Sequence, residues 1–187
     1  MPPPFVKRSK VLLDPTAVKV ATVIGFPFGY SVIEAKLAET VMAIVDGADE
    51  LDMVMNIAAL KNGDLDYLEK EVNVVLEMVH KNKRVLKVII ESGILTNEEI
   101  IKCCELYAKA GVDFVKTSTG YAEKGASVEA VQLIRKHLPS NVQVKASGGI
   151  RTYEFASQLI AAGADRLGCS ASIAIVSGAP DLSESKY

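Results

Sequence analysis

The sequence contains little of what metal sites, disulfide frameworks and membrane segments are built from. It has three cysteines and two histidines among 187 residues. Cys103 and Cys104 are neighbours and Cys169 lies far away, which matches neither a disulfide framework nor a zinc site. No apolar run approaches the roughly 18 residues of a membrane span, and the first five residues, MPPPF, have no apolar signal-peptide core. We therefore expect a protein of the reducing cytoplasm that needs no metal or other cofactor and contacts no membrane.

Neither positive nor negative residues are in large excess. Charged residues make up 24% of the chain, and the formal net charge is −2, so the composition does not favour binding to nucleic acid. Hydrophobic residues reach 49%, enough for one domain with a sizeable core. No linker divides the chain. We expect a single domain over residues 1–177 and a polar C-terminal tail over residues 178–187.

Six short segments rich in valine and isoleucine alternate with helical patterns. The expected strands are 18–24, 50–55, 85–91, 112–117, 142–146 and 165–169. The expected helices are Glu34–Asp46, Leu65–Lys81, Asn97–Ala110, Val128–His137 and Glu154–Ala162, with a further helix at Pro4–Leu13. This alternation predicts βα units and a parallel sheet.

Three helix ends share one pattern, in which glycine and a small residue precede an aspartate and the next strand. They read Asp46-Gly-Ala-Asp49, Ala110-Gly-Val-Asp113 and Ala162-Gly-Ala-Asp165. Glycine there supplies the left-handed position that ends a helix, so the recurrence indicates a repeated αβ unit. Longer loops with glycine, serine and threonine follow the strands instead. Parallel α/β folds and (β/α)8 barrels place their sites at these carboxyl ends of the strands.

Two of the expected strands end in a lysine. Lys116 is followed by Thr-Ser-Thr-Gly120, and Lys145 by Ala-Ser-Gly-Gly149. A lysine at a strand end can simply extend to solvent, and for one lysine alone that interpretation is the better one. Two such lysines in successive units favour function, because neighbouring ammonium groups disfavour each other's charge and can yield a neutral amine. Such an amine forms Schiff bases with carbonyl substrates.

Acidic residues also interrupt apolar strands. Asp52 lies within Leu51-Asp-Met-Val-Met55, where a buried carboxylate needs a partner such as a lysine across a barrel. Glu91 falls on the same strand side as Lys87. A structural ion pair is the alternative for each. We interpret Asp52 as functional and Lys87 with Glu91 as a supporting pair.

Two later loops suit an anion. Ser147-Gly-Gly-Ile-Arg-Thr152 and Leu167-Gly-Cys-Ser-Ala171 each lead toward a helix after the last two strands, where backbone amides and an arginine can hold a phosphate. A simple tight turn is the alternative for Gly148-Gly149 alone. The candidate substrate- and phosphate-binding residues are Gly120, Gly148, Gly149, Arg151, Gly168 and Ser170.

Four segments together resemble deoxyribose-phosphate aldolase, a class I aldolase. They are Glu50–Asn56, Leu86–Glu91, Phe114–Gly120 and Val144–Thr152, in the same order on successive strands. The resemblance implies a TIM-type (β/α)8 barrel that cleaves 2-deoxyribose 5-phosphate reversibly to acetaldehyde and glyceraldehyde 3-phosphate, without a metal. It implies that Lys116 forms the Schiff base, that Lys145 perturbs it, and that Asp52 belongs to the proton relay. Glycine, arginine and serine of the two late loops fall where the family binds phosphate.

The sequence departs from the family in two places. The last phosphate loop reads Gly168-Cys-Ser-Ala171, which lacks one hydroxyl and predicts weaker phosphate binding. Six strands are present where the barrel needs eight, and by motif alignment the chain begins after the family's second strand. We therefore expect an incomplete barrel whose exposed apolar edge invites pairing with another chain, as in a homo-oligomer.

Two further functions compete with the aldolase. One is an inactive barrel remnant that binds a phosphorylated ligand without catalysis, which the missing strands favour. The other is a different Schiff-base barrel enzyme, which the pair of lysine motifs disfavours. The tail ends in Tyr187, and relatives that end in tyrosine imply a role for it in proton transfer. A tail with no role is the alternative that composition favours.

Overall fold

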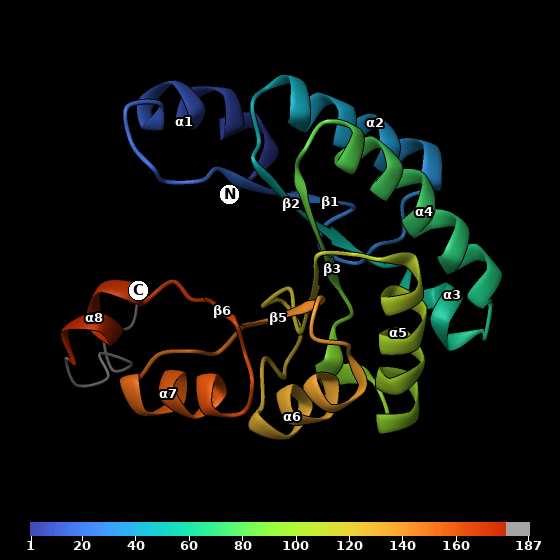
Figure 1. Cartoon of the computed structure of the whole chain (residues 1–187), viewed down its shortest axis with the longest axis vertical. Helices are drawn as coiled ribbons and strands as arrows, with labels where there is room; N and C mark the ends of the chain where they lie inside the picture. Colours follow the sequence, from blue (N-terminus) through green and yellow to red (C-terminus); the bar gives the residue numbers. More distant parts are fainter. Residues whose placement is uncertain (179–187) are drawn as a thin grey trace.

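The computed structural model describes residues 1–178, and these form one curved sheet of six parallel strands (Figure 1). The strands pair in chain order. Their bounds are β1 Ala21–Ile24, β2 Glu50–Val54, β3 Val85–Ile89, β4 Phe114–Lys116, β5 Gln143–Ser147 and β6 Arg166–Gly168. The prediction of a parallel, incomplete barrel is confirmed. Five of the six strands are shorter than expected: β1, β4 and β6 begin later, and β2, β3, β4 and β6 end earlier.

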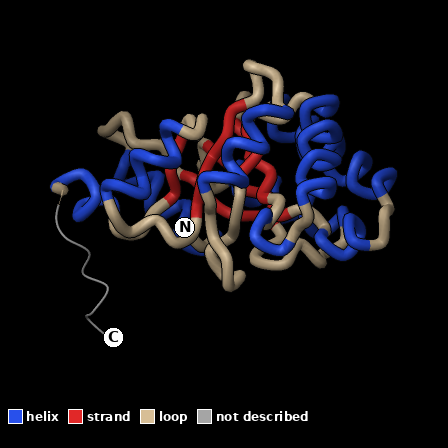
Figure 2. The backbone as a smooth tube through the Cα atoms, turned by 90° about the horizontal axis from the view of Figure 1, so that it is seen from below, coloured by secondary structure: helices blue, strands red, loops and turns tan. Residues whose placement is uncertain are grey.

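Helices cover the outer side of this arc (Figure 1), and the view turned by 90° shows the strands in the middle with helices on either side (Figure 2). The helices are α1 Val6–Leu13, α2 Ile33–Val45, α3 Ile57–Lys61, α4 Leu65–Lys81, α5 Asn97–Ala110, α6 Val128–His137, α7 Tyr153–Ala161 and α8 Ser172–Ser177. Two single turns of 3-10 helix lie at Pro3–Phe5 and Ser92–Ile94. Within the described residues the arc is open between α1 and α8 (Figure 1), because neither edge strand, β1 or β6, pairs on its outer side.

The two faces of the sheet differ in chemistry. Side chains that point toward the helices are apolar and buried, and include Leu51, Met53, Leu86, Val88, Val115 and Val144. Strand alternation places the other set on the concave face, and the register aligns Asp52 with Lys87 and Lys116 with Lys145. This face is strongly charged: it carries Glu50, Asp52, Lys87, Lys116, Lys145 and Arg166.

The repeated glycine-to-aspartate turns have a structural reason beyond helix termination. Gly47, Gly111 and Gly163 all have positive φ angles, of 97°, 82° and 109°. The aspartate two residues later then accepts a hydrogen bond from a backbone N–H of the preceding strand segment. The three bonds run from Val20 to Asp49 at 2.9 Å, from Leu86 to Asp113 at 2.8 Å and from Val144 to Asp165 at 2.7 Å. Each turn thus fixes the amino end of a strand.

Candidate active site

Three lysines from three strands converge on one carboxylate. The Nζ atoms of Lys116 and Lys145 donate to Oδ2 of Asp52 at 2.8 and 2.7 Å, and Nζ of Lys87 donates to Oδ1 at 2.8 Å. Asp52 is 3% exposed and Lys87 is fully buried. The predicted proximity of Asp52, Lys116 and Lys145 is therefore confirmed.

The expected pairing of Lys87 with Glu91 is wrong. Lys87 bonds to Asp52 and also forms a salt bridge of 2.7 Å with Glu50. Strand alternation no longer applies at Glu91, because β3 ends at Ile89 and Glu91 takes a left-handed backbone conformation. Its carboxylate turns instead toward Thr119 in the loop after β4. The contact of Lys87 with Asp52 follows from the register that aligns these two residues on neighbouring strands, which the pattern within one strand does not reveal.

The cluster shifts the protonation of its members. Burial alone would raise the pKa of Asp52, but the ammonium groups of Lys116, Lys87 and Lys145 together hold it far below its usual value. Burial lowers the pKa of Lys145, and the nearby charge of Lys116 lowers it further, against the attraction of Asp52. Asp52 is therefore a stable anion, whereas Lys145 can release a proton more readily than a lysine in water.

The phosphate-binding candidates lie in one polar pocket beside this cluster. The pocket has a volume of about 440 Å³. All six predicted binding residues line it together with Lys116 and Lys145: Gly120, Gly148, Gly149, Arg151, Gly168, Ser170, Lys116 and Lys145. Two further polar lining residues, Thr119 and Ser147, lie in segments that the sequence singled out but were not among the predicted binding residues. The predicted anion loops are thus brought together with the lysines in one site.

Hydrogen bonds between the loops after β4 and β5 hold this pocket in shape. The Thr117 hydroxyl accepts from the Ser147 N–H at 3.0 Å, and the Ser147 hydroxyl donates to the Ser118 carbonyl at 2.6 Å. A Cβ on Gly125 would lie 2.3 Å from the carbonyl oxygen of Gly148, so this close approach of two backbones needs glycine. The lysine-bearing strands and their loops therefore form one connected unit.

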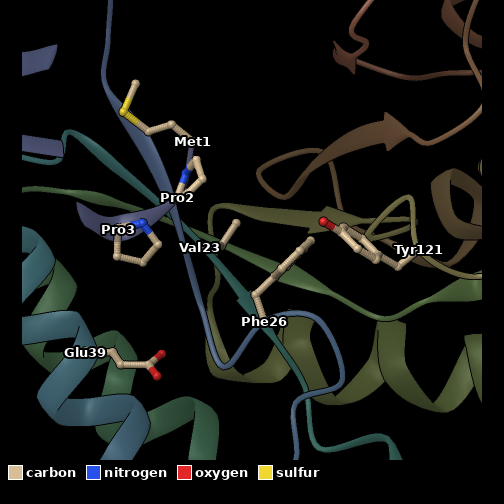
Figure 3. Close-up of a pocket in the computed structure, with 7 residues that line it drawn as sticks. All are labelled: Met1, Pro2, Pro3, Val23, Phe26, Glu39 and Tyr121. Carbon is tan, nitrogen blue, oxygen red and sulfur yellow. The ribbon is translucent and has the colours of Figure 1, made fainter. Parts of the chain in front are cut away.

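An apolar pocket of about 570 Å³ lies next to β1 (Figure 3). Val23, Phe26 and Tyr121 line it with the first three residues and Glu39. The rings of Phe26 and Tyr121 meet edge to face, with centroids 5.4 Å apart. Tyr121 directly follows Gly120, so the loop after β4 borders both pockets. The sequence analysis did not identify this pocket, because its residues come from segments far apart in the chain.

Three further predictions concern metal ions, membrane spans and the C-terminal tail. Among residues 1–178 no group of three acidic, histidine or cysteine side chains is placed to hold a metal ion. No helix in that range is long and apolar enough to cross a bilayer. Tyr187 and most of the expected tail lie outside the described residues.

Comparison with known proteins agrees with this geometry. The chain is 53% identical to the deoxyribose-phosphate aldolase of Thermococcus kodakarensis over 88% of its length and 73% of that protein. It is 52% identical to the enzyme of the same name from Bacillus cereus, over 93% of this chain and 78% of the other.

Solved structures give the same result. A putative deoxyribose-phosphate aldolase from Coccidioides immitis superposes with a TM-score of 0.90 at 42% identity, covering 94% of this chain and 70% of the other. The tetrameric deoxyribose phosphate aldolase of Aeropyrum pernix does so with a TM-score of 0.87 at 31% identity, covering 94% and 74%. The family model described as DeoC/LacD family aldolase matches residues 2–178. The chain therefore belongs to the DeoC/LacD aldolase family.

Proposed function

We propose that the chain is a class I aldolase that reversibly cleaves 2-deoxy-D-ribose 5-phosphate to D-glyceraldehyde 3-phosphate and acetaldehyde. The observation that carries the proposal is the position of Lys116. Its amine bonds to a buried carboxylate, and Lys116 also lines a polar pocket together with Arg151 and several glycines. A substrate with an aldehyde at one end and a phosphate at the other suits both features.

Lys116 is the proposed nucleophile. Its neutral amine adds to the C1 aldehyde of the open-chain sugar, and loss of water gives a protonated imine. Removal of the C3 hydroxyl proton then breaks the C2–C3 bond. The bonding electrons move to the imine and form an enamine, while C3 to C5 leave as glyceraldehyde 3-phosphate. Protonation of the enamine at C2 and hydrolysis of the imine release acetaldehyde and restore the lysine.

Asp52 and Lys145 are the proposed proton handlers. Asp52 accepts a hydrogen bond from the Lys116 amine, and the Lys145 amine donates to the same Oδ2 atom of Asp52. Both groups therefore lie next to the Lys116 amine. An anionic carboxylate stabilises the positive charge of the imine and directs protons between the two amines. The lowered pKa of Lys145 suits a group that gives and regains a proton in each turnover.

The polar pocket is the proposed phosphate site. Arg151 supplies a cation, and the glycine loops at Gly148-Gly149 and Gly168 leave backbone N–H groups accessible to an anion. The missing hydroxyl at Ala171 predicts weaker binding of phosphate than in a loop with two serines.

The reaction itself tests the proposal. The purified chain is incubated with 2-deoxyribose 5-phosphate, and both products are measured, with Lys116→Met as the control. We expect products from the parent chain and none above background from the variant. Binding of the substrate by the parent without product would instead support a phosphate-ligand binder.

The proposed setting is the cytoplasm, and the proposed assembly is a homo-oligomer. All three cysteines are unpaired, as expected under reducing conditions. Within the described residues the outer edges of β1 and β6 have no partner strand, and Ile173 and Val176 on α8 are more than four-fifths exposed. Light scattering after size-exclusion chromatography measures the number of subunits, and a monomer at micromolar concentration would contradict the proposed assembly.

A further inference from the structure

Glu91 has an unusual backbone for its residue type. It follows β3 with φ 54° and ψ 54°, the left-handed region that residues other than glycine rarely occupy. Its side chain is also buried, with the residue 4% exposed. This conformation is strained for a residue with a side chain, and such strain is found where surrounding contacts or function require it.

The side-chain hydrogen bonds of Glu91 all go to the loop that follows Lys116. Its carboxylate accepts from the Thr119 N–H at 3.3 and 3.2 Å and from the Thr119 hydroxyl. The next residue, Ser92, donates its N–H to the Thr117 carbonyl at 2.7 Å. Within residues 1–178 no lysine, arginine or histidine forms a salt bridge with Glu91. The carboxylate is therefore committed to Thr119.

These bonds fix the direction of the Thr119 hydroxyl. A hydroxyl has one proton, and the Thr119 hydroxyl donates it to the Glu91 side chain. The Thr119 oxygen also accepts from the Tyr121 N–H at 3.1 Å. What remains for a ligand is one lone pair. Because Thr119 lines the polar pocket, it presents an acceptor there.

An acceptor at this place discriminates among ligand groups. Phosphate and carbonyl oxygens are themselves acceptors and gain nothing from it, whereas a hydroxyl can donate to it. The proposed substrate carries hydroxyls between the carbon that joins Lys116 and the phosphate. A site that accepts a hydrogen bond from a substrate hydroxyl rejects the analogue without it, because the buried acceptor is then left unpaired.

We propose that Glu91 is a positioning residue that holds the Thr119 hydroxyl as a hydrogen-bond acceptor, so that the site selects acceptor aldehydes with a hydroxyl beside the carbonyl. The inference rests on the proposed function. Glu91 does not touch the reacting atoms. It acts through Thr119, and its removal should change selectivity more than the chemistry at Lys116.

The test compares two acceptors in the synthetic direction with acetaldehyde: glyceraldehyde 3-phosphate and 3-phosphooxypropanal, which lacks the hydroxyl. Glu91→Gly removes the carboxylate and at the same time suits the left-handed backbone. We expect the preference in kcat/KM for the hydroxylated acceptor to fall at least about tenfold, with little change in kcat for the other acceptor. Glu91→Gln keeps an oxygen that can accept from Thr119, and should retain the parent preference.

Two results would contradict the proposed role of Glu91. An unchanged preference in Glu91→Gly, or an equal loss for both acceptors, would overturn the positioning role. If Glu91→Gly does not fold, Thr119→Val and Thr119→Ser decide. Loss of preference in the valine variant with retention in the serine variant supports the inference, and retention in the valine variant overturns it. A parent chain that forms no borohydride-trapped imine with acetaldehyde would remove the proposed function, and this inference with it.

Discussion

Lys116 and Lys145 donate to the same oxygen atom, Oδ2 of Asp52, from neighbouring strands that pair these two lysines in register. One carboxylate thus controls the distance between two amines that would otherwise repel each other. The other oxygen of Asp52 bonds to Lys87, which fixes the carboxylate from its far side. The arrangement keeps the proposed nucleophile and the proposed proton donor together in a largely buried site.

Replacement of Asp52 should affect turnover more than substrate binding. Asp52→Asn keeps the shape but loses the charge, so we expect kcat to fall about a hundredfold or more, with a smaller change in KM because the phosphate loops are untouched. Asp49→Asn is the matched control, since Asp49 lies just before the amino end of the same strand, away from the pockets. Steady-state kinetics, together with thermal unfolding of each variant, distinguish a catalytic role of Asp52 from a structural one. An Asp52→Asn chain that is unfolded would show that Asp52 is chiefly structural.

Asp52 should also make stability depend on acid pH. Its pKa is far lower in the folded chain than the ordinary value of 3.8. The unfolded chain therefore binds a proton first as the pH falls, so the stabilisation is present above about pH 4 and is lost progressively below it. We expect the unfolding free energy from urea titrations to fall less between pH 6 and pH 3 in Asp52→Asn than in the parent. Equal slopes would contradict the depressed pKa.

Lys145 and Lys87 should differ in their contribution although both contact Asp52. Lys145 bonds to the oxygen that Lys116 uses and lines the polar pocket, whereas Lys87 bonds to the opposite oxygen. We expect Lys145→Met to lower kcat about a hundredfold or more and Lys87→Met to lower it less. Borohydride trapping at Lys116 should persist in the Lys145 variant at high pH. The reverse order of the two kcat values would argue against proton handling by Lys145.

A second buried ion pair should contribute to the stability of the fold. Lys36 on α2 and Glu71 on α4 are 0% and 1% exposed, with Nζ and Oε1 2.6 Å apart. Burial lowers the pKa of Lys36 and raises that of Glu71. Lys36→Met leaves a buried carboxylate without its partner and should cost about 3–5 kcal/mol of unfolding free energy. The double variant Lys36→Met/Glu71→Leu should recover most of this loss in urea titrations, and no recovery would contradict the account.

The sequence predicted the parts of this structure that follow a repeating pattern. Strand alternation and the glycine-to-aspartate turns indicate the parallel sheet, and Asp52, Lys116 and Lys145 stand out because each interrupts an apolar strand. The helix α3 was missed, and α8 was expected only as a helix of unstated length after Ala171, since five and six residues carry too little periodicity. The contacts of Lys87 and Glu91 were misjudged, because they depend on the register between strands and on a left-handed residue after β3.

The identity of the imine-forming lysine is the central claim, and borohydride trapping tests it most directly. The parent chain is treated with acetaldehyde and borohydride, digested and mapped by mass spectrometry. We predict an ethyl group on Lys116, with Lys116→Met unlabelled at the site and Lys145 unmodified in the parent. A label found only on Lys145, or spread over surface lysines at random, would contradict the account.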